Sequence, residues 1–225
     1  MDYPFLPKSR IQRAARLLRE ETFGDEAVYR VDLDAVAYDV LYPRDDLVLV
    51  DDEVLPREDG EKVLGITQPI RGRIKICASL REDRYPGRRR FTIAHEIGHW
   101  ILHRELFQPL ANQDGMLDEQ HDRIVTLQRN IESAPTSQPE EWQANHFAAW
   151  LLIGEIELRE EVRKRYDQYP VMPPKGMTLK DFANQMAADR SDGTSLADRF
   201  GVSRTAMRIA LENRGLVTHS LPLFS

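Results

Sequence analysis

The stretch FTIAHEIGHW, residues 91–100, contains the pattern that decides how the rest of the chain is interpreted. Two histidines, His95 and His99, stand four positions apart, and Glu96 directly follows the first of them. On an α-helix such a pair lies on one face about 5–6 Å apart, so both imidazoles can reach one metal ion. Zinc bound by histidines lowers the pKa of a coordinated water toward about 7, and Glu96 can then accept the water's proton. The pattern predicts a zinc-binding helix with Glu96 as general base.

The alternative interpretation is a chance occurrence of this pattern on an ordinary core helix. The apolar residues Phe91, Ala94, Ile97 and Ile101 recur at helical spacing, which predicts a helix over residues 90–106 that packs on a core. A core helix that also carries two histidines and a glutamate in this spacing is typical of a metal site. We therefore expect a zinc ion here, with manganese as the alternative, because histidine and carboxylate ligands accept both metals.

A third ligand is expected from a second helix, predicted over residues 139–153. Its start contains Glu140 and Glu141, and the pairing of Ser137 with Glu140 is typical of a capping box, which leaves Glu141 for the metal. The alternative is that both glutamates form a solvated acidic helix start. Asn145 stands four residues after Glu141 and is expected to hydrogen-bond a ligating histidine or the carboxylate.

His103 continues the series of histidines by one further helical turn. On an unbroken helix it lies about 6 Å further along the axis, which is too far for it to share the ion. We expect His103 to be a buried residue beside the ligands and not a ligand itself.

The stretches RRRFTIAHEIGHWILH (88–103) and EWQANHFAAWLLI (141–153) together resemble the ImmA/IrrE family of metallopeptidases. In that family HExxH, followed by a leucine and a histidine, precedes a second helix of the form E-x-x-A-N-x-F-A-A-x-L-L. The resemblance covers about residues 5–155 and, more loosely, the C-terminal helices. It implies activity on a repressor protein and a gluzincin-like site. The residues that it implies for this site are the zinc ligands His95, His99 and Glu141 and the base Glu96.

One departure from the family pattern lies between the two helices. The separation between His99 and Glu141 is longer than the resemblance leads us to expect. We interpret the polar residues 107–139 as an insertion through which substrate access or regulation is peculiar to this protein. A short helix is expected within the insertion, around residues 118–130.

The remaining elements predict an α+β fold. Helices are expected over residues 9–22 and 32–41, and three antiparallel strands over 47–55, 62–70 and 72–80. The small antiparallel sheet is expected to pack on the HExxH helix and on the second ligand-bearing helix. An extended substrate is expected to pair with an edge strand near 72–80.

A small module of three helices is expected to follow the catalytic domain. These helices are predicted near residues 178–190, 194–200 and 204–214. The expected divisions of the chain are residues 1–158 for a zincin-like metallopeptidase domain, 159–177 for a connector, 178–216 for a helix-turn-helix-like module and 217–225 for a tail.

The stretch TSLADRFGVSRTAMRIALENRGLV (194–217) fits a helix-turn-helix pattern that would present Arg204, Thr205 and Arg208 outward. Its small excess of positive charge is a weak electrostatic footprint for DNA. The same arrangement of helices also serves as a packing module. We therefore expect structural or protein-docking use, with DNA or partner contact through these three residues as the alternative.

Composition bounds the class of function. The chain has 225 residues, 41% of them apolar, and a net charge of −6, which disfavours a main role in holding phosphate backbones. Its single cysteine, Cys77, cannot form an internal disulfide, and we expect neither a leader nor a membrane span.

These observations predict a cytoplasmic zinc endopeptidase that acts on a protein substrate, with a helix-turn-helix repressor as the expected substrate and no membrane partner. One alternative is a non-enzymatic DNA- or protein-binding regulator with a structural metal site. Another is a toxin or stress-response peptidase whose target is not a repressor.

Overall fold

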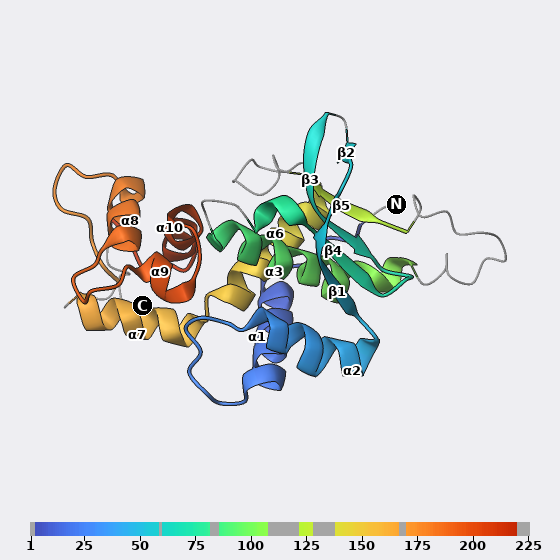
Figure 1. Ribbon diagram of the computed structural model, residues 1–225. Coiled ribbons are helices and arrows are strands. Elements are labelled where there is room, and N and C mark those ends of the chain that lie inside the picture. The colour runs from blue at the N-terminus through green and yellow to red at the C-terminus, as the bar shows by residue number, and fades with distance from the viewer. Residues whose placement is uncertain are drawn as a thin grey trace. The chain divides into compact units, whose positions relative to one another are not determined.

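The computed structural model describes residues 3–58, 60–81, 86–107, 122–127, 138–166 and 170–219 (Figure 1). The chain divides into two compact units. The first comprises residues 1–26 and 32–151, and the second comprises residues 27–31 and 152–225. The chain therefore enters the second unit briefly before it completes the first. Among the described residues, no helix has both the length and the apolar content that crossing a membrane requires.

The first unit opens with α1 (Lys8–Phe23). This helix buries Ile11 and Leu18 on one face, as the spacing of its apolar residues predicts. It ends before Gly24, whose φ of 61° lies in the left-handed region that glycine adopts without strain. The helix predicted over residues 9–22 is confirmed.

A second helical stretch consists of a π-helix, η1 (Ala35–Leu41), that continues into α2 (Tyr42–Asp45). At its start the Asp32 carboxylate accepts a hydrogen bond from the backbone amide of Asp34 at 3.0 Å. The helix predicted over residues 32–41 is confirmed, but the apolar spacing gave no indication of its π geometry.

The sheet of the first unit has the strand order β1-β4-β3-β2, and β5 also pairs with β3 (Figure 1). The α+β class is therefore confirmed, together with the three predicted strands, which correspond to β1, β3 and β4. The strands are β1 (Val48–Glu53), β2 (Arg57–Glu58), β3 (Glu61–Gln68), β4 (Arg73–Cys77) and β5 (Ile124–Leu127).

The predicted antiparallel pairing holds for β3 and β4, but β1 pairs with β4 in parallel. Two reversals of direction explain the difference, because β2 is antiparallel to β3 and β3 is antiparallel to β4. Strand β4 consequently has a paired neighbour on each side. The prediction that an edge strand near residues 72–80 receives the substrate is therefore wrong over Arg73–Cys77.

The insertion returns to the sheet as β5, which is antiparallel to β3. The short helix expected around residues 118–130 is therefore wrong over Ile124–Leu127, and most of its other residues lie outside the described part of the chain. The β-branched run Ile-Val-Thr favours a strand here. Just before it, the buried Asp122 carboxylate accepts hydrogen bonds from the backbone amides of Ile70 (2.7 Å) and Arg71 (3.0 Å), which fastens β5 to the β3–β4 turn.

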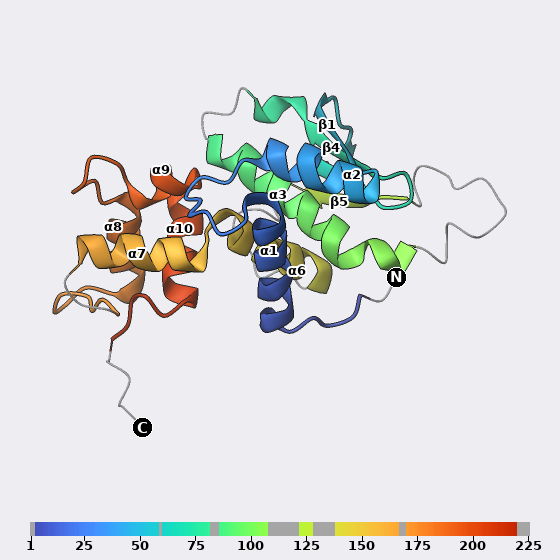
Figure 2. The ribbon, with the colours of Figure 1, turned by 90° about the horizontal axis from the view of Figure 1, so that it is seen from below.

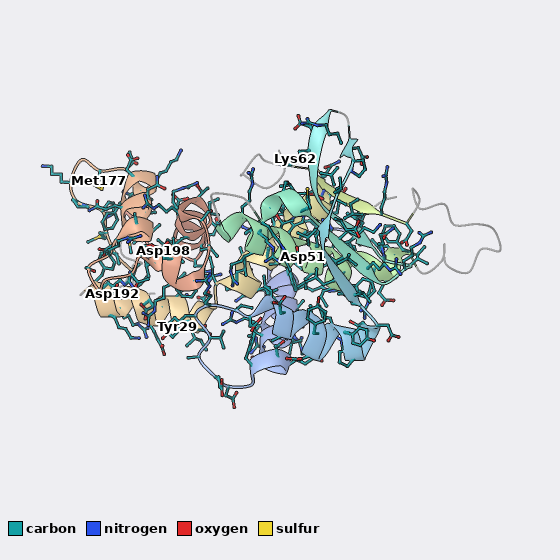
Figure 3. The ribbon with its side chains drawn as sticks, in the orientation of Figure 1. Tyr29, Asp51, Lys62, Met177, Asp192 and Asp198 are labelled. Carbon is teal, nitrogen blue, oxygen red and sulfur yellow. The ribbon has the colours of Figure 1, made fainter. Side chains whose placement is uncertain are left out.

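The two predicted ligand-bearing helices are confirmed as α3 (Pro86–His103) and α6 (Pro139–Leu152). α3 packs on β3 and β4, and Figure 2 shows it between the strands and α6. Short 3-10 turns follow β4 and α3, at η2 (Ala78–Leu80) and η3 (Arg104–Phe107). Near the start of α3, Arg89 forms an ion pair with Asp51 of β1, a residue labelled in Figure 3.

The three predicted helices of the C-terminal module are confirmed within the second unit. Each begins at a side-chain cap, because a hydroxyl of Thr178, Ser195 or Ser203 accepts a hydrogen bond from a backbone amide three residues later. The helices are α8 (Leu179–Ala188), α9 (Leu196–Phe200) and α10 (Arg204–Asn213).

The second unit also contains α7 (Glu155–Arg165), which the sequence did not predict. Part of this helix lies in the expected connector, residues 159–177, and the domain limits given above stay predictions. The highly charged sequence of α7 gave no indication of which positions are buried. Glu161 is one of the buried residues and is only 1% exposed, and nearby cationic side chains surround it. Its ion-pair partners are Lys164 (3.1 Å), Arg165 (3.3 Å) and Arg199 (3.1 Å).

Candidate metal centre

His95 and His99 lie one helical turn apart on α3, and both are fully buried. Their Nε2 atoms face each other at 2.9 Å. The apolar residues Ile93, Ala94 and Ile97 anchor this part of α3 in the core, so the helix presents both imidazoles from a rigid element. The structure therefore brings together the pair that the HExxH spacing predicts.

Glu141 reaches the two histidines from α6 and is only 2% exposed. Its Oε1 atom lies 3.1 Å from His99 Nε2, and its Oε2 atom lies 3.4 Å from His95 Nε2. One candidate ligand atom from each of the three residues lies within 4.8 Å of the others, so the group can hold a metal ion. This is the set of three side chains that the sequence analysis named.

Gly98 allows α6 to come this close to α3. A Cβ atom at this position would lie 3.2 Å from both Cα and O of Ala144 and 3.2 Å from Cβ of Phe147. These contacts are tighter than ordinary van der Waals separations, so any side chain at position 98 would push the two helices apart. The glycine inside HExxH therefore helps to place Glu141 at the histidines.

Hydrogen bonds behind His99 fix the position of its ring proton. Gln143 Nε2 donates to the Pro4 carbonyl at 2.8 Å, which leaves Gln143 Oε1 to accept from His103 Nε2 at 3.0 Å. His103 Nδ1 then accepts from His99 Nδ1 at 3.0 Å, and the lone pair of His99 points through Nε2 toward Glu141. Burial and the neighbouring His99 lower the pKa of His103 to about 3, so this ring is neutral.

Asn145 does the same for His95, because its Oδ1 atom lies 3.0 Å from His95 Nδ1 and accepts that proton. Both histidines therefore turn Nε2 toward Glu141 and toward the other ring, where one metal ion could bind both. Burial alone would lower the pKa of His95, but Glu141 outweighs it and raises that pKa.

The donor set fits zinc. Burial alone would raise the pKa of Glu141, but the two histidines outweigh it and lower that pKa, so the group is a carboxylate. Two imidazoles and one carboxylate are the three-ligand set of many catalytic zinc sites, in which the fourth position takes water or substrate. A divalent ion bound here would balance the negative charge of the buried Glu141 carboxylate.

Glu96 is fully buried beside this cluster and lies against strand β3. The Thr67 hydroxyl lies 2.6 Å from Glu96 Oε2, and both side chains are shielded from solvent. Thr67, Gln143 and Pro4 could not be predicted from sequence spacing, because each acts through a contact between distant parts of the chain. His103 and Asn145, by contrast, lie where helical spacing predicts them.

The predicted contact residues of the helix-turn-helix segment belong to the second unit. Arg204 and Thr205 are exposed at the start of α10. Arg208 forms an ion pair with Glu212 at 2.7 Å, and its side chain is only 14% exposed. Arg208 is therefore less exposed than Arg204 and Thr205, and a contact role for the three residues stays a prediction.

A sheet that packs on an HExxH helix, with a glutamate from a second helix at the two histidines, defines the class of HExxH metalloproteins. The chain belongs to the Peptidase_M78 family: the model of its IrrE N-terminal-like domain matches residues 79–212, more than half of the sequence. This is a family of metallopeptidases, as the ImmA/IrrE resemblance predicted. The matched residues include α3 and α6, and the match ends at residue 212, within α10.

Among solved structures, the chain is similar to a "Mycobacterium tuberculosis transcriptional regulator", with 18% sequence identity and a TM-score of 0.46. The similarity covers 88% of this chain and 45% of that chain, so the chain spans less than half the length of that protein. A comparison with curated proteins gives no match.

Proposed function

We propose that this chain is a cytoplasmic zinc-dependent endopeptidase that hydrolyses a peptide bond in a protein substrate. The observation that carries the proposal is the convergence of His95, His99 and Glu141 in a buried cluster, with Glu96 beside it. Membership of a metallopeptidase family supports the same chemistry.

In this proposal His95, His99 and Glu141 would hold zinc through their Nε2 and carboxylate oxygen atoms. The ion supplies a Lewis acid and a water of lowered pKa. Glu96 accepts a proton from the attacking water and passes it to the leaving amine, which is the role of a general base and then a general acid. Asn145 and His103 hold the two imidazoles with their Nε2 lone pairs toward the ion.

The substrate that we propose is a helix-turn-helix transcriptional repressor. The support is the resemblance of both ligand-bearing helices to the ImmA/IrrE family. The exposed Arg204 and Thr205 offer a surface for docking a protein partner, and DNA is the less favoured ligand because the chain is acidic. A toxin or stress-response peptidase would share the chemistry with a different target, whereas a non-enzymatic regulator would keep only the metal.

The experiment is incubation of the chain with a cognate helix-turn-helix repressor, with and without a chelator, followed by mass spectrometry of the fragments. We expect one discrete cut that needs added zinc and is absent with Glu96→Gln. A cut in another protein but not in the repressor would favour the stress-response alternative. Bound metal without cleavage of any protein would favour the regulator. Repeating the reaction with manganese tests which metal sustains turnover.

A further inference from the structure

A buried contact that the proposed function does not use joins strand β3 to Glu96. Thr67 is fully buried, and its Oγ1 atom lies 2.6 Å from Glu96 Oε2 and 3.1 Å from the Glu96 carbonyl oxygen. A carboxylate and a carbonyl both accept hydrogen bonds, so the single hydroxyl proton goes to the shorter contact. Hydrogen bonds from a hydroxyl to a charged oxygen are short and strong, and this distance is typical of them.

Gly65 completes the surface on which Glu96 rests. A Cβ atom at position 65 would lie 2.2 Å from Glu96 Oε1 and 2.6 Å from its Cδ, so only glycine lets this carboxylate lie against the strand. Residues 65 and 67 share one face of β3, because side chains alternate along a strand. Gly65 therefore leaves the space in which the Glu96 carboxylate lies, and the Thr67 hydroxyl on the same face of β3 holds the carboxylate there.

The strand itself is fixed on both edges at this point. Thr67 is opposite Ile74 of β4 and opposite Ile124 of β5. A residue in the middle of a paired sheet has little freedom to move, so its hydroxyl is a fixed donor. The hydrogen bond thus ties the orientation of Glu96 to the sheet, and not to α3 alone.

We infer that Thr67 is a positioning residue for the proposed general base and holds the Glu96 carboxylate in the orientation that proton transfer requires. This inference rests on the proposed function of the same site. A general base must stay within hydrogen-bond reach of the proton that it accepts, and a buried carboxylate without this donor has other rotamers to occupy. The Thr67 side chain does not itself touch the substrate.

The test compares Thr67→Val, which keeps the shape and removes the hydroxyl, with Thr67→Ser, which keeps the hydroxyl. Thr92→Val is the matched control, because Thr92 is equally buried but donates to the Arg88 carbonyl within α3. We expect Thr67→Val to lower kcat on the order of tenfold or more, with KM and bound zinc unchanged. Thr67→Ser should restore most of kcat, and Thr92→Val should match the wild type.

Unchanged kcat in Thr67→Val, or equal losses in the serine and valine variants, would overturn the inference while the proposed function stands. Crystal structures of the wild type and the variants give a readout that needs no activity. The Glu96 carboxylate should contact the hydroxyl at position 67 in the wild type and in Thr67→Ser. In Thr67→Val it should turn away from β3, and an unmoved carboxylate overturns the inference.

If the valine variant does not fold, Thr67→Ala replaces it with the same expectations. A wild type that cleaves nothing refutes the proposed function, and the crystal structures then decide this inference separately.

Discussion

Each unit contains a buried carboxylate, and the negative charges of the two carboxylates are balanced in different ways. In the second unit Glu161 is 1% exposed and has a lysine and two arginines around it. In the first unit Glu141 is 2% exposed, and the described residues bring only two histidines within ion-pair distance. A buried charge is costly unless it is paired. Cations of the chain itself compensate the charge of Glu161, whereas at Glu141 we propose that a bound metal ion takes this role.

The Glu161 cluster is balanced within the chain, whereas the Glu141 cluster could hold a metal ion. Arg165 extends the structural cluster to Asp192 at 2.5 Å, a residue labelled in Figure 3, so permanent cations and anions balance within the chain. At Glu141 the imidazoles are held with Nε2 toward the carboxylate, because their Nδ1 atoms contact Asn145 and His103. In the proposed function the three side chains held in this way bind a cation from solution.

The largest expected effect is from Glu141→Ala. This variant removes the carboxylate that contacts the two histidines, so we expect the loss of bound zinc and, with it, of all cleavage. Metal analysis by mass spectrometry after dialysis measures this directly. Glu140→Ala is the matched control on the preceding residue and should keep full zinc content. Equal zinc content in the two variants would transfer the ligand role to another residue.

Glu96→Gln should separate metal binding from chemistry. The amide keeps the size of the side chain but cannot accept a proton, so we expect cleavage to fall roughly 10³-fold while zinc stays bound. Turnover rates and zinc content measured on one preparation check this. Retained turnover would exclude Glu96 as the base.

Glu161→Gln should affect the second unit alone. Removal of the buried anion leaves Arg165, itself 2% exposed, without this partner, and we expect a loss of about 3 kcal/mol in the free energy of unfolding. Denaturant titration measures the loss, and zinc content measured alongside should be unchanged. Reduced zinc binding in the folded variant would show that the two clusters do not act independently.

Gln143→Leu should have the smallest effect. It removes the acceptor for His103 Nε2, so the ring proton of His103 can move to Nδ1. A protonated Nδ1 can no longer accept the hydrogen bond from His99 Nδ1. We expect zinc affinity to fall roughly tenfold without loss of folding, as measured by competition with a chelating dye. Unchanged affinity would mean that His99 keeps its tautomer without this chain of hydrogen bonds.

The helices and the ligands follow from spacing within short stretches of sequence. The pairs His95–His99 and Glu141–Asn145 are local patterns. The family resemblance then predicts that the two pairs belong to one site. α1, α8 and α10 likewise show one apolar face and therefore could be predicted.

What escaped prediction depends on contacts between distant residues. The parallel pairing of β1 with β4 follows from the order of the hairpins, and β5 depends on the Asp122 contacts with the β3–β4 turn. The sequence of α7 is highly charged, so it does not reveal that Glu161 is buried. This burial is evident only in the fold, which brings Arg199 to Glu161. Thr67 looks like an ordinary strand residue until the fold places it at Glu96.

The most direct test of the central claim is a crystal structure grown with zinc, with the anomalous signal collected at the zinc edge. The account predicts one peak bonded to His95 Nε2, His99 Nε2 and the Glu141 carboxylate, at roughly 2.0–2.2 Å from each. A peak at other residues, or a zinc-soaked crystal in which these three side chains point apart, would contradict it.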